Sequence, residues 1–234
     1  MQSPPLSVTL PTGAEIRSHG GAGPSAVVCV NGGRAAEVPG TWSASIEWLV
    51  GRLAPRFPEL RFAEVRYRIR SWKRLDLCVE DAFAAVEAAG AVRTLLIGFS
   101  MGGAVAVRTA AHPSVVGVLG LAPWLPDRLD LAPLRGRRLD VLHGALDRWL
   151  PGIPGVSPAL SRRGFDRARR LGIDGSYTLI SGAVHAIALR SPRGEPVPLP
   201  RAARWAELAA ARIDSLALGS AEGEGFEPSK SLHP

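Results

Sequence analysis

Several residue types are scarce in this 234-residue sequence, and each scarcity excludes a class of protein. Cys29 and Cys78 are the only cysteines, and each lies in an apolar pattern typical of a small buried side chain. Two such cysteines supply neither a disulfide framework nor the ligand spacing of a metal site. We therefore expect no disulfide, no metal and no cofactor.

Long hydrophobic runs are also missing. No segment reaches the roughly 20 apolar residues that a membrane-spanning helix needs, and residues 1–5 lack the basic and apolar parts of a secretory signal. Hydrophobic residues nevertheless make up 46% of the chain, as in soluble globular proteins. We expect a cytoplasmic protein that does not bind membranes.

Lysine is nearly absent. Lys73 and Lys230 are the only lysines among 28 basic residues, so the net charge of +7 is almost entirely arginine. The densest clusters, 66–74 and 162–170, fall where strand edges and amphipathic helices carry solvated charge. The arginines match no nucleic-acid-binding motif, so no nucleic-acid partner is expected. The charge is still able to steer anionic small molecules.

Apolar runs of strand length alternate with segments of helical period along most of the chain. A hairpin is predicted over residues 6–18, strands near 25–30, 62–69, 95–99, 115–122, 139–143 and 177–180, and helices over 45–56, 75–89, 102–112, 157–171 and 201–218. This order predicts an α/β fold, a mainly parallel β-sheet with helices on both faces in a three-layer sandwich. We expect one domain over residues 1–218 and a disordered tail over 219–234, where breaker residues replace any periodicity.

The most informative motif is Gly98-x-Ser100-x-Gly102, which joins an apolar strand to a helix rich in alanine and valine. A strand that turns this sharply into a helix strains the central residue, and side chains at the flanking positions would collide with their surroundings. Such a turn exposes the serine hydroxyl near a helix N-terminus, where negative charge is favoured. Ser100 is therefore the candidate nucleophile.

A serine nucleophile needs a neighbouring base. Because functional residues collect after strands at the carboxyl edge of a parallel sheet, His185, in the loop after the last strand, is the preferred base. His143 is followed directly by Gly144, so we interpret it as shaping a turn. His112 lies about 18 Å along the helix from Ser100, too far for contact.

The group that orients the base should follow another strand. Asp147 follows the strand that ends at His143, and it is preferred over Asp127 and Asp130, which follow the 115–122 strand. An exposed aspartate paired with Arg148 is the competing interpretation of Asp147.

An acyl-transfer site also needs backbone donors for its oxyanion. The N–H of Met101, at the start of the helix, is one candidate. The second is the N–H of Gly33, with Arg34 as its neighbour, in the glycine-rich loop after the 25–30 strand. A plain glycine turn is the alternative.

The motif at 98–102, followed along the chain by Asp147 and His185, resembles the nucleophile elbow and triad order of the α/β-hydrolase fold family. The resemblance covers most of the chain, and it departs from the common pattern at Asn31, where many members have histidine. It implies an acyl-serine mechanism in which Ser100 attacks, His185 transfers the proton, Asp147 orients His185, and water completes hydrolysis.

Many members of this family carry a cap domain after the strand that corresponds to 115–122. Only residues 123–138 separate that strand from the next one here, so we expect an open site without a lid. Its apolar walls are predicted to include Trp42, Trp124 and Trp149, although each is equally compatible with ordinary packing.

The expected function is hydrolysis of a small-molecule carboxylic ester or thioester. The sequence does not distinguish esterase from thioesterase, lipase, perhydrolase or peptidase chemistry. The alternative is a ligand-binding protein that keeps the same fold with little or no catalysis, because fold alone does not fix function.

Overall fold

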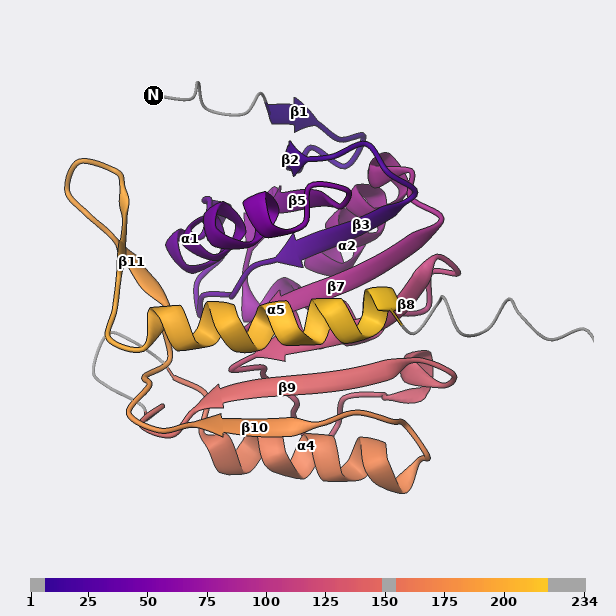
Figure 1. The fold of residues 1–234 in the computed structure, drawn as a ribbon, viewed down its shortest axis with the longest axis vertical. Coiled ribbons are helices and arrows are strands. Elements are labelled where there is room, and N and C mark those ends of the chain that lie inside the picture. Colours follow the sequence, from indigo (N-terminus) through magenta and orange to yellow (C-terminus); the bar gives the residue numbers. More distant parts are fainter. Residues whose placement is uncertain (1–6, 149–154, 219–234) are drawn as a thin grey trace, which may run out of the picture.

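The computed structural model describes residues 7–148 and 155–218, which are built around an eight-stranded sheet (Figure 1). Its strands lie in the order β1-β2-β5-β3-β7-β8-β9-β10. The β1–β2 and β2–β5 pairs are antiparallel, and every pair from β5 onward is parallel. The strand bounds are Ser7–Thr9 (β1), Glu15–Gly20 (β2), Ser25–Val30 (β3), Arg61–Arg66 (β5), Arg93–Phe99 (β7), Val115–Leu121 (β8), Arg138–Gly144 (β9) and Tyr177–Ile180 (β10). The predicted α/β fold class is confirmed.

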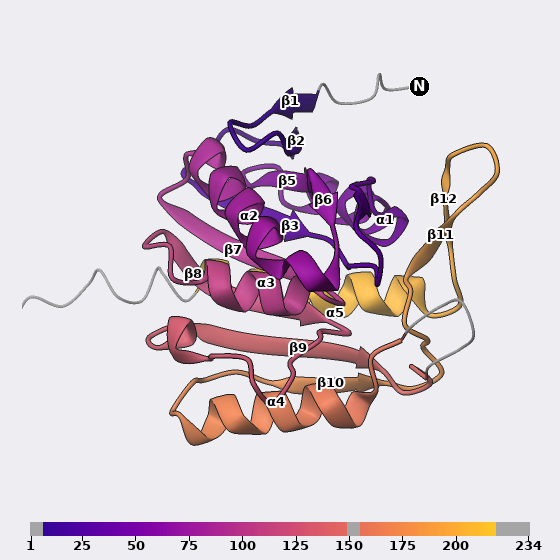
Figure 2. The same ribbon diagram turned by 180° about the vertical axis from the view of Figure 1, so that it is seen from behind.

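Helices cover both faces of the sheet, each over its own hydrophobic core (Figures 1 and 2). One face carries α1 (Ala44–Leu53) and α5 (Ala202–Leu218), and the other carries α2 (Leu75–Ala89), α3 (Gly102–Thr109) and α4 (Pro158–Arg170). None of the helices in the described part of the chain is long and apolar enough to cross a membrane.

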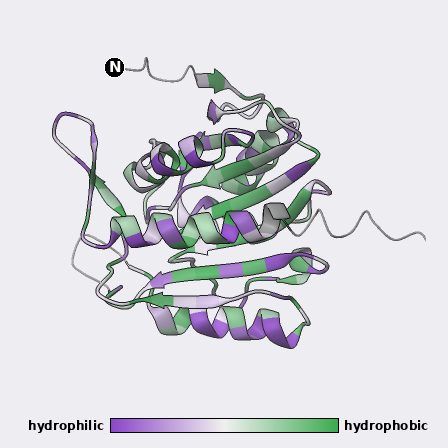
Figure 3. Cartoon of the chain, in the orientation of Figure 1, coloured by the Kyte–Doolittle hydropathy of each residue, from purple (hydrophilic) through white to green (hydrophobic). Residues whose placement is uncertain are grey.

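Local sequence explains where these helices begin and end. The Ser43 and Ser157 side chains accept hydrogen bonds from backbone N–H groups in the first turns of α1 and α4. Helix α2 ends at Gly90, whose φ of 58° is the left-handed conformation that glycine adopts without strain. In α4 the buried residues lie on one side, and the exposed arginines make the outer surface hydrophilic (Figure 3).

The hydrophobic pattern does not predict two small antiparallel pairs, each of which contributes one strand, β6 or β11, to the cleft described below. Strand β4 (Val38–Pro39) pairs with β6 (Ile69–Arg70), and β11 (Ala188–Arg190) pairs with β12 (Pro196–Pro198) in a hairpin that projects from the body (Figure 2). These strands have two or three residues each, and β4 and β12 contain prolines, so no alternating pattern develops.

The connection from β8 to β9 is fully described and short. Residues 122–137 contain one turn of 3-10 helix, Ala132–Leu134, and no helical lid. Leu125 is fully buried, and the Arg167 side chain donates hydrogen bonds to the carbonyls of Pro126 and Leu129. The chain is thereby held against the body. The other 3-10 turns are Ala54–Arg56 and Trp72–Arg74.

Candidate active site

Ser100 occupies the turn between β7 and α3 with a φ of 56°, a strained conformation for a residue with a side chain. Its N–H donates to the Leu121 carbonyl at 3.0 Å, which ties the turn to the neighbouring strand β8. A side chain at Gly98 would collide with the Gly102 backbone, and a Cβ at Gly102 would lie 2.5 Å from the Val30 carbonyl oxygen. The two glycines are therefore sterically required, as the motif predicts.

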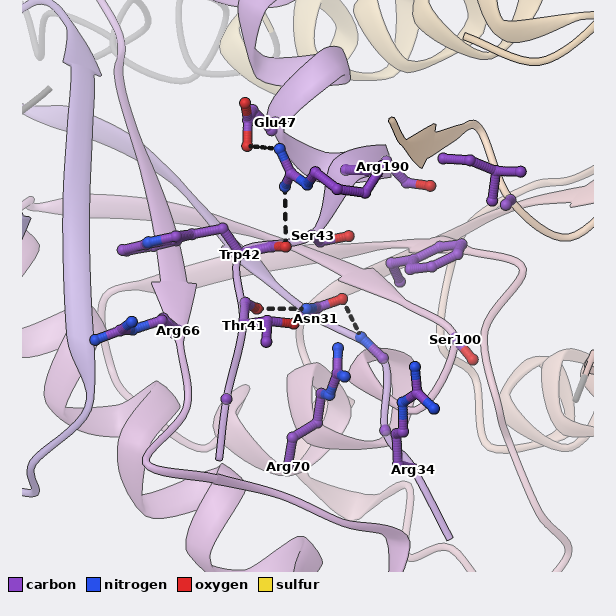
Figure 4. Close-up of a pocket in the computed structure, with 18 of the residues that line it drawn as sticks. Asn31, Arg34, Thr41, Trp42, Ser43, Glu47, Arg66, Arg70, Ser100 and Arg190 are labelled. Atoms are coloured by element: carbon purple, nitrogen blue, oxygen red, sulfur yellow. Dashed lines mark hydrogen bonds and ion pairs between the residues drawn. The ribbon is translucent and has the colours of Figure 1, made fainter. Parts of the chain in front are cut away.

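Ser100 lines a cleft of about 1150 Å³ at the carboxyl edge of the sheet (Figure 4). The loop after β3, the segment between β4 and α1, the start of α1, strand β6, the loop after β10 and the β11–β12 hairpin form its walls. His185 and Phe99 also line it. The cleft therefore lies at the edge where functional residues are expected.

Asp147 and His185 meet beside this cleft. Asp147 follows β9 in a tight turn, and its Oδ2 lies 2.6 Å from His185 Nδ1. The Asp147 side chain is fully buried, whereas that of His185 is 12% exposed. Since a carboxylate only accepts, Nδ1 carries the proton of this hydrogen bond and Nε2 is the ring's other nitrogen.

A second histidine contacts the same carboxylate. His143, fully buried near the end of β9, lies with Nε2 3.0 Å from Asp147 Oδ2 and 2.9 Å from the Val156 carbonyl oxygen. Its Nδ1 lies 2.7 Å from the Ser161 hydroxyl of α4. The interpretation of His143 as a turn residue was therefore incomplete, because strand spacing alone does not reveal a contact with α4.

The pKa of Asp147 reflects competing effects. Burial favours the neutral acid, but hydrogen bonds from His143 and His185, together with their charge, hold the pKa below its usual range. Asp147 is therefore an anion at neutral pH, as a group that orients an imidazole must be. It forms no ion pair with Arg148 among the described contacts.

The loop after β3 brings backbone N–H groups to the nucleophile. A Cβ at Gly32 would lie 3.1 Å from Ser100 Cβ, so this backbone packs directly on the serine. The Gly32 N–H donates to the Asn31 side chain at 2.6 Å, while the N–H groups of Gly33 and Met101 have no partner in residues 7–148 and 155–218. Asn31 also donates to the Thr41 carbonyl, so it shapes this loop.

The predicted wall residues have different outcomes. Arg34 and Trp42 line the cleft, and the Arg17 guanidinium lies 4.4 Å from the Trp42 ring centroid. Trp124 lies outside the lining and packs on Trp72, with ring centroids 5.0 Å apart. Trp149 falls outside the described residues.

Sequence reasoning missed several residues of the cleft, namely Trp72, Arg17, Arg66, Arg70 and Arg190. They reach it from β2, β5, β6, β11 and a 3-10 turn, and Arg17 and Arg190 lie far from the other three in the chain. The sequence predicts only solvated charge for the cluster 66–74, whereas Arg66, Arg70 and Trp72 of this cluster line the cleft in the structure.

The other candidates lie elsewhere. Asp127 is exposed and faces Arg163 and Arg167 of α4, and Asp130 accepts a hydrogen bond from the Ala132 N–H.

Burial raises the pKa of the Cys29 thiol far above its usual range and that of Cys78 to about 11, so both thiols stay protonated. No group of three potential metal ligands occurs within the described residues.

Comparison of the sequence with models of protein families and with curated proteins finds no match. Solved structures do match. An esterase from Thermogutta terrifontis has a TM-score of 0.63 at 16% identity over 97% of both chains. An α/β serine hydrolase homologue from Coxiella burnetii has a TM-score of 0.63 at 14% identity over 91% of this chain and 98% of its own.

An α/β serine hydrolase without a lid, from Xanthomonas campestris, has a TM-score of 0.55 at 17% identity over 79% of this chain and 86% of its own. At these identities the likeness concerns the fold alone. The chain adopts the α/β-hydrolase fold.

Proposed function

We propose that the protein is a serine hydrolase that cleaves carboxylic esters or thioesters through an acyl-serine intermediate. The observation that carries this proposal is the strained Ser100, which faces the same cleft as an imidazole held at 2.6 Å by a buried carboxylate. The fold shared with esterases and other serine hydrolases supports the same chemistry.

In the proposed reaction, Ser100 Oγ attacks the carbonyl carbon of the substrate while His185 Nε2 takes its proton. Within the described structure no hydrogen bond joins Ser100 to His185, so the two groups must align when substrate binds. The oxyanion receives hydrogen bonds from the Met101 and Gly33 N–H groups. His185 then protonates the leaving alcohol or thiol. Water, deprotonated by His185, attacks the acyl carbon, and the bond to Ser100 Oγ breaks as His185 returns the proton to Oγ and the acid is released.

A panel of 4-nitrophenyl esters and acyl thioesters of increasing chain length tests the proposal. Ser100→Ala and His185→Ala should each lower kcat/KM by several orders of magnitude, and Ser100→Ala should do so with an unchanged melting temperature. Ser215→Ala, at an exposed position of α5, is the matched control. Turnover that survives Ser100→Ala contradicts the proposed nucleophile. Absence of turnover on the whole panel favours the ligand-binding alternative.

A further inference from the structure

Among the described residues, five arginines and one carboxylate line the cleft around Ser100. Figure 4 shows Arg34, Arg66, Arg70 and Arg190 of this set. The carboxylate, Glu47, lies 2.9 Å from both Arg17 and Arg190, and Arg17 also lies 3.0 Å from Glu64. Arg66 is paired with Glu15. Three of the five guanidinium groups are thus neutralised by the protein itself.

The remaining two, Arg34 and Arg70, form no ion pair within residues 7–148 and 155–218. Glu37, the acidic residue nearest to Arg34 in sequence, lies 3.8 Å from Arg74 instead. Arg70 is half-buried, and its Nε is a buried donor without a partner among the described residues. In Figure 4 both side chains extend in the same direction, with Arg34 between Arg70 and Ser100.

The positive charges of Arg34 and Arg70 also repel each other. Burial is the main cause that lowers the pKa of Arg70, and the charge of Arg34 lowers it further. The adjacent Trp72 Nε1 is, like Arg70 Nε, a buried donor without a partner among the described residues, whereas Arg34 is exposed. Two buried donors of this kind are unfavourable unless an acceptor enters the cleft.

The pair is held close to the reacting centre. The Trp72 N–H donates to the Arg34 carbonyl at 2.9 Å, and the Val38–Arg70 pairing fixes β6 beside the same loop. A Cβ on Gly33 would lie 2.5 Å from Trp72 Cδ1. The arginines therefore flank the backbone that packs on Ser100, without using the N–H groups assigned to the oxyanion.

We infer that Arg34 and Arg70 bind an anionic group of the substrate, a carboxylate or a phosphate, at a distance from the bond that is cleaved. This inference rests on the proposed hydrolase function and narrows its substrates to esters or thioesters that carry a second, negatively charged group. The planar guanidinium suits both anions, because it donates two parallel hydrogen bonds to their oxygens.

Three 4-nitrophenyl esters of equal chain length test the inference, with a terminal carboxylate, phosphonate or methyl group on the acyl chain. The wild-type kcat/KM should be at least about tenfold higher for one of the anionic esters than for the methyl-terminated ester. The anionic ester with the higher kcat/KM identifies the preferred anion. Arg34→Gln and Arg70→Gln should each reduce kcat/KM for the preferred anionic ester by about tenfold or more. They should change kcat/KM for the methyl-terminated ester by less than about twofold. Arg70→Lys should retain part of the preference, and added salt should weaken it.

Arg108→Gln, at an exposed position of α3 outside the cleft, controls for the loss of one positive charge. Equal kcat/KM for all three esters, or equal losses on charged and neutral esters in the arginine variants, overturns the inference while the hydrolase proposal stands. Calorimetric titration of Ser100→Ala with the same esters measures binding without turnover. If no ester is hydrolysed, the hydrolase proposal fails, and this titration still decides whether the arginine pair selects anions.

Discussion

At Asp147 one carboxylate oxygen is shared by two imidazoles, those of His185 and His143. The two rings differ in surroundings, because His185 reaches the cleft whereas His143 is enclosed by Val156, Ser161 and α4. His143 therefore acts on His185 only through Asp147, as a positioning residue.

Replacing His143 with phenylalanine tests this arrangement. The ring volume is kept, but Asp147 and the Val156 carbonyl each lose the hydrogen bond from His143, while the Ser161 hydroxyl keeps Pro158 and Tyr177 as partners. The free energy of unfolding should therefore fall by about 1–3 kcal/mol. The kcat of ester hydrolysis should fall while KM stays unchanged, since Asp147 loses one of its two anchors. Urea unfolding and steady-state kinetics measure these effects.

His112→Phe provides the control, because His112 lies after α3 and contacts Ser114 instead of the cleft. Wild-type stability and kcat in His143→Phe would show that the buried ring neither stabilises the fold nor positions Asp147.

The lowered pKa of Asp147 predicts a pH-dependent contribution to stability. Because the folded-state pKa lies below the unfolded value, this contribution is complete above the unfolded value and disappears as the pH falls through the folded one. Wild type should exceed Asp147→Asn in free energy of unfolding at pH 7, and the difference should shrink below about pH 4.

Urea titrations from neutral pH down to about pH 3 measure this difference. Asp214→Asn, at an exposed position of α5, controls for the loss of a carboxylate. A difference between wild type and Asp147→Asn that stays constant over this range contradicts the account of the Asp147 pKa.

At the scale of elements, the turn from β7 to α3 depends on glycines that have no room for a side chain. Gly98→Ala should lower the free energy of unfolding by about 1–3 kcal/mol, because its Cβ meets backbone that cannot move aside. Gly51→Ala in α1 is a matched control, since nothing lies within 4 Å of the added methyl group. That variant should be neutral or more stable by about 0.5–1 kcal/mol.

Thermal and urea unfolding of the two variants measure the contrast. Equal stability of both would show that the Ser100 turn tolerates a side chain, and the steric account of the motif would then be wrong.

Most elements of the sheet and both helical layers are predictable from the sequence because their signals are local. The 75–89 helix has a clear apolar stripe and a glycine that ends it, and the observed α2 has the same bounds. The β4–β6 and β11–β12 pairs have no such signal, because each forms between short segments, and β4 and β6 lie far apart in the chain. They carry Arg70 and Arg190, so the charge of the cleft could not be predicted.

At the scale of the whole molecule, the strand order decides which loops meet. Because β3 lies between β5 and β7, the loop after β3 comes to lie beside Ser100. The rule that parallel strands end at one edge is enough to select Ser100, Asp147 and His185 as candidates. It does not specify which neighbours surround them, and the contacts of His143, Trp72 and the arginines depend on that long-range packing.

The placement of the excess positive charge also depends on long-range packing. The sequence shows an excess of arginine but not its placement. In the fold, five arginines line one cleft and others cover the outer surface of α4. The excess is therefore compatible with selection of an anionic substrate and requires no nucleic-acid partner.

Labelling with a fluorophosphonate probe, followed by mass spectrometry of the modified peptide, tests the central claim most directly. The account predicts a single phosphonylated residue, Ser100, with no labelling of Ser100→Ala and much slower labelling of His185→Ala and Asp147→Asn. A folded wild-type protein, verified by its cooperative thermal transition, that stays unlabelled or is modified at another residue would contradict it.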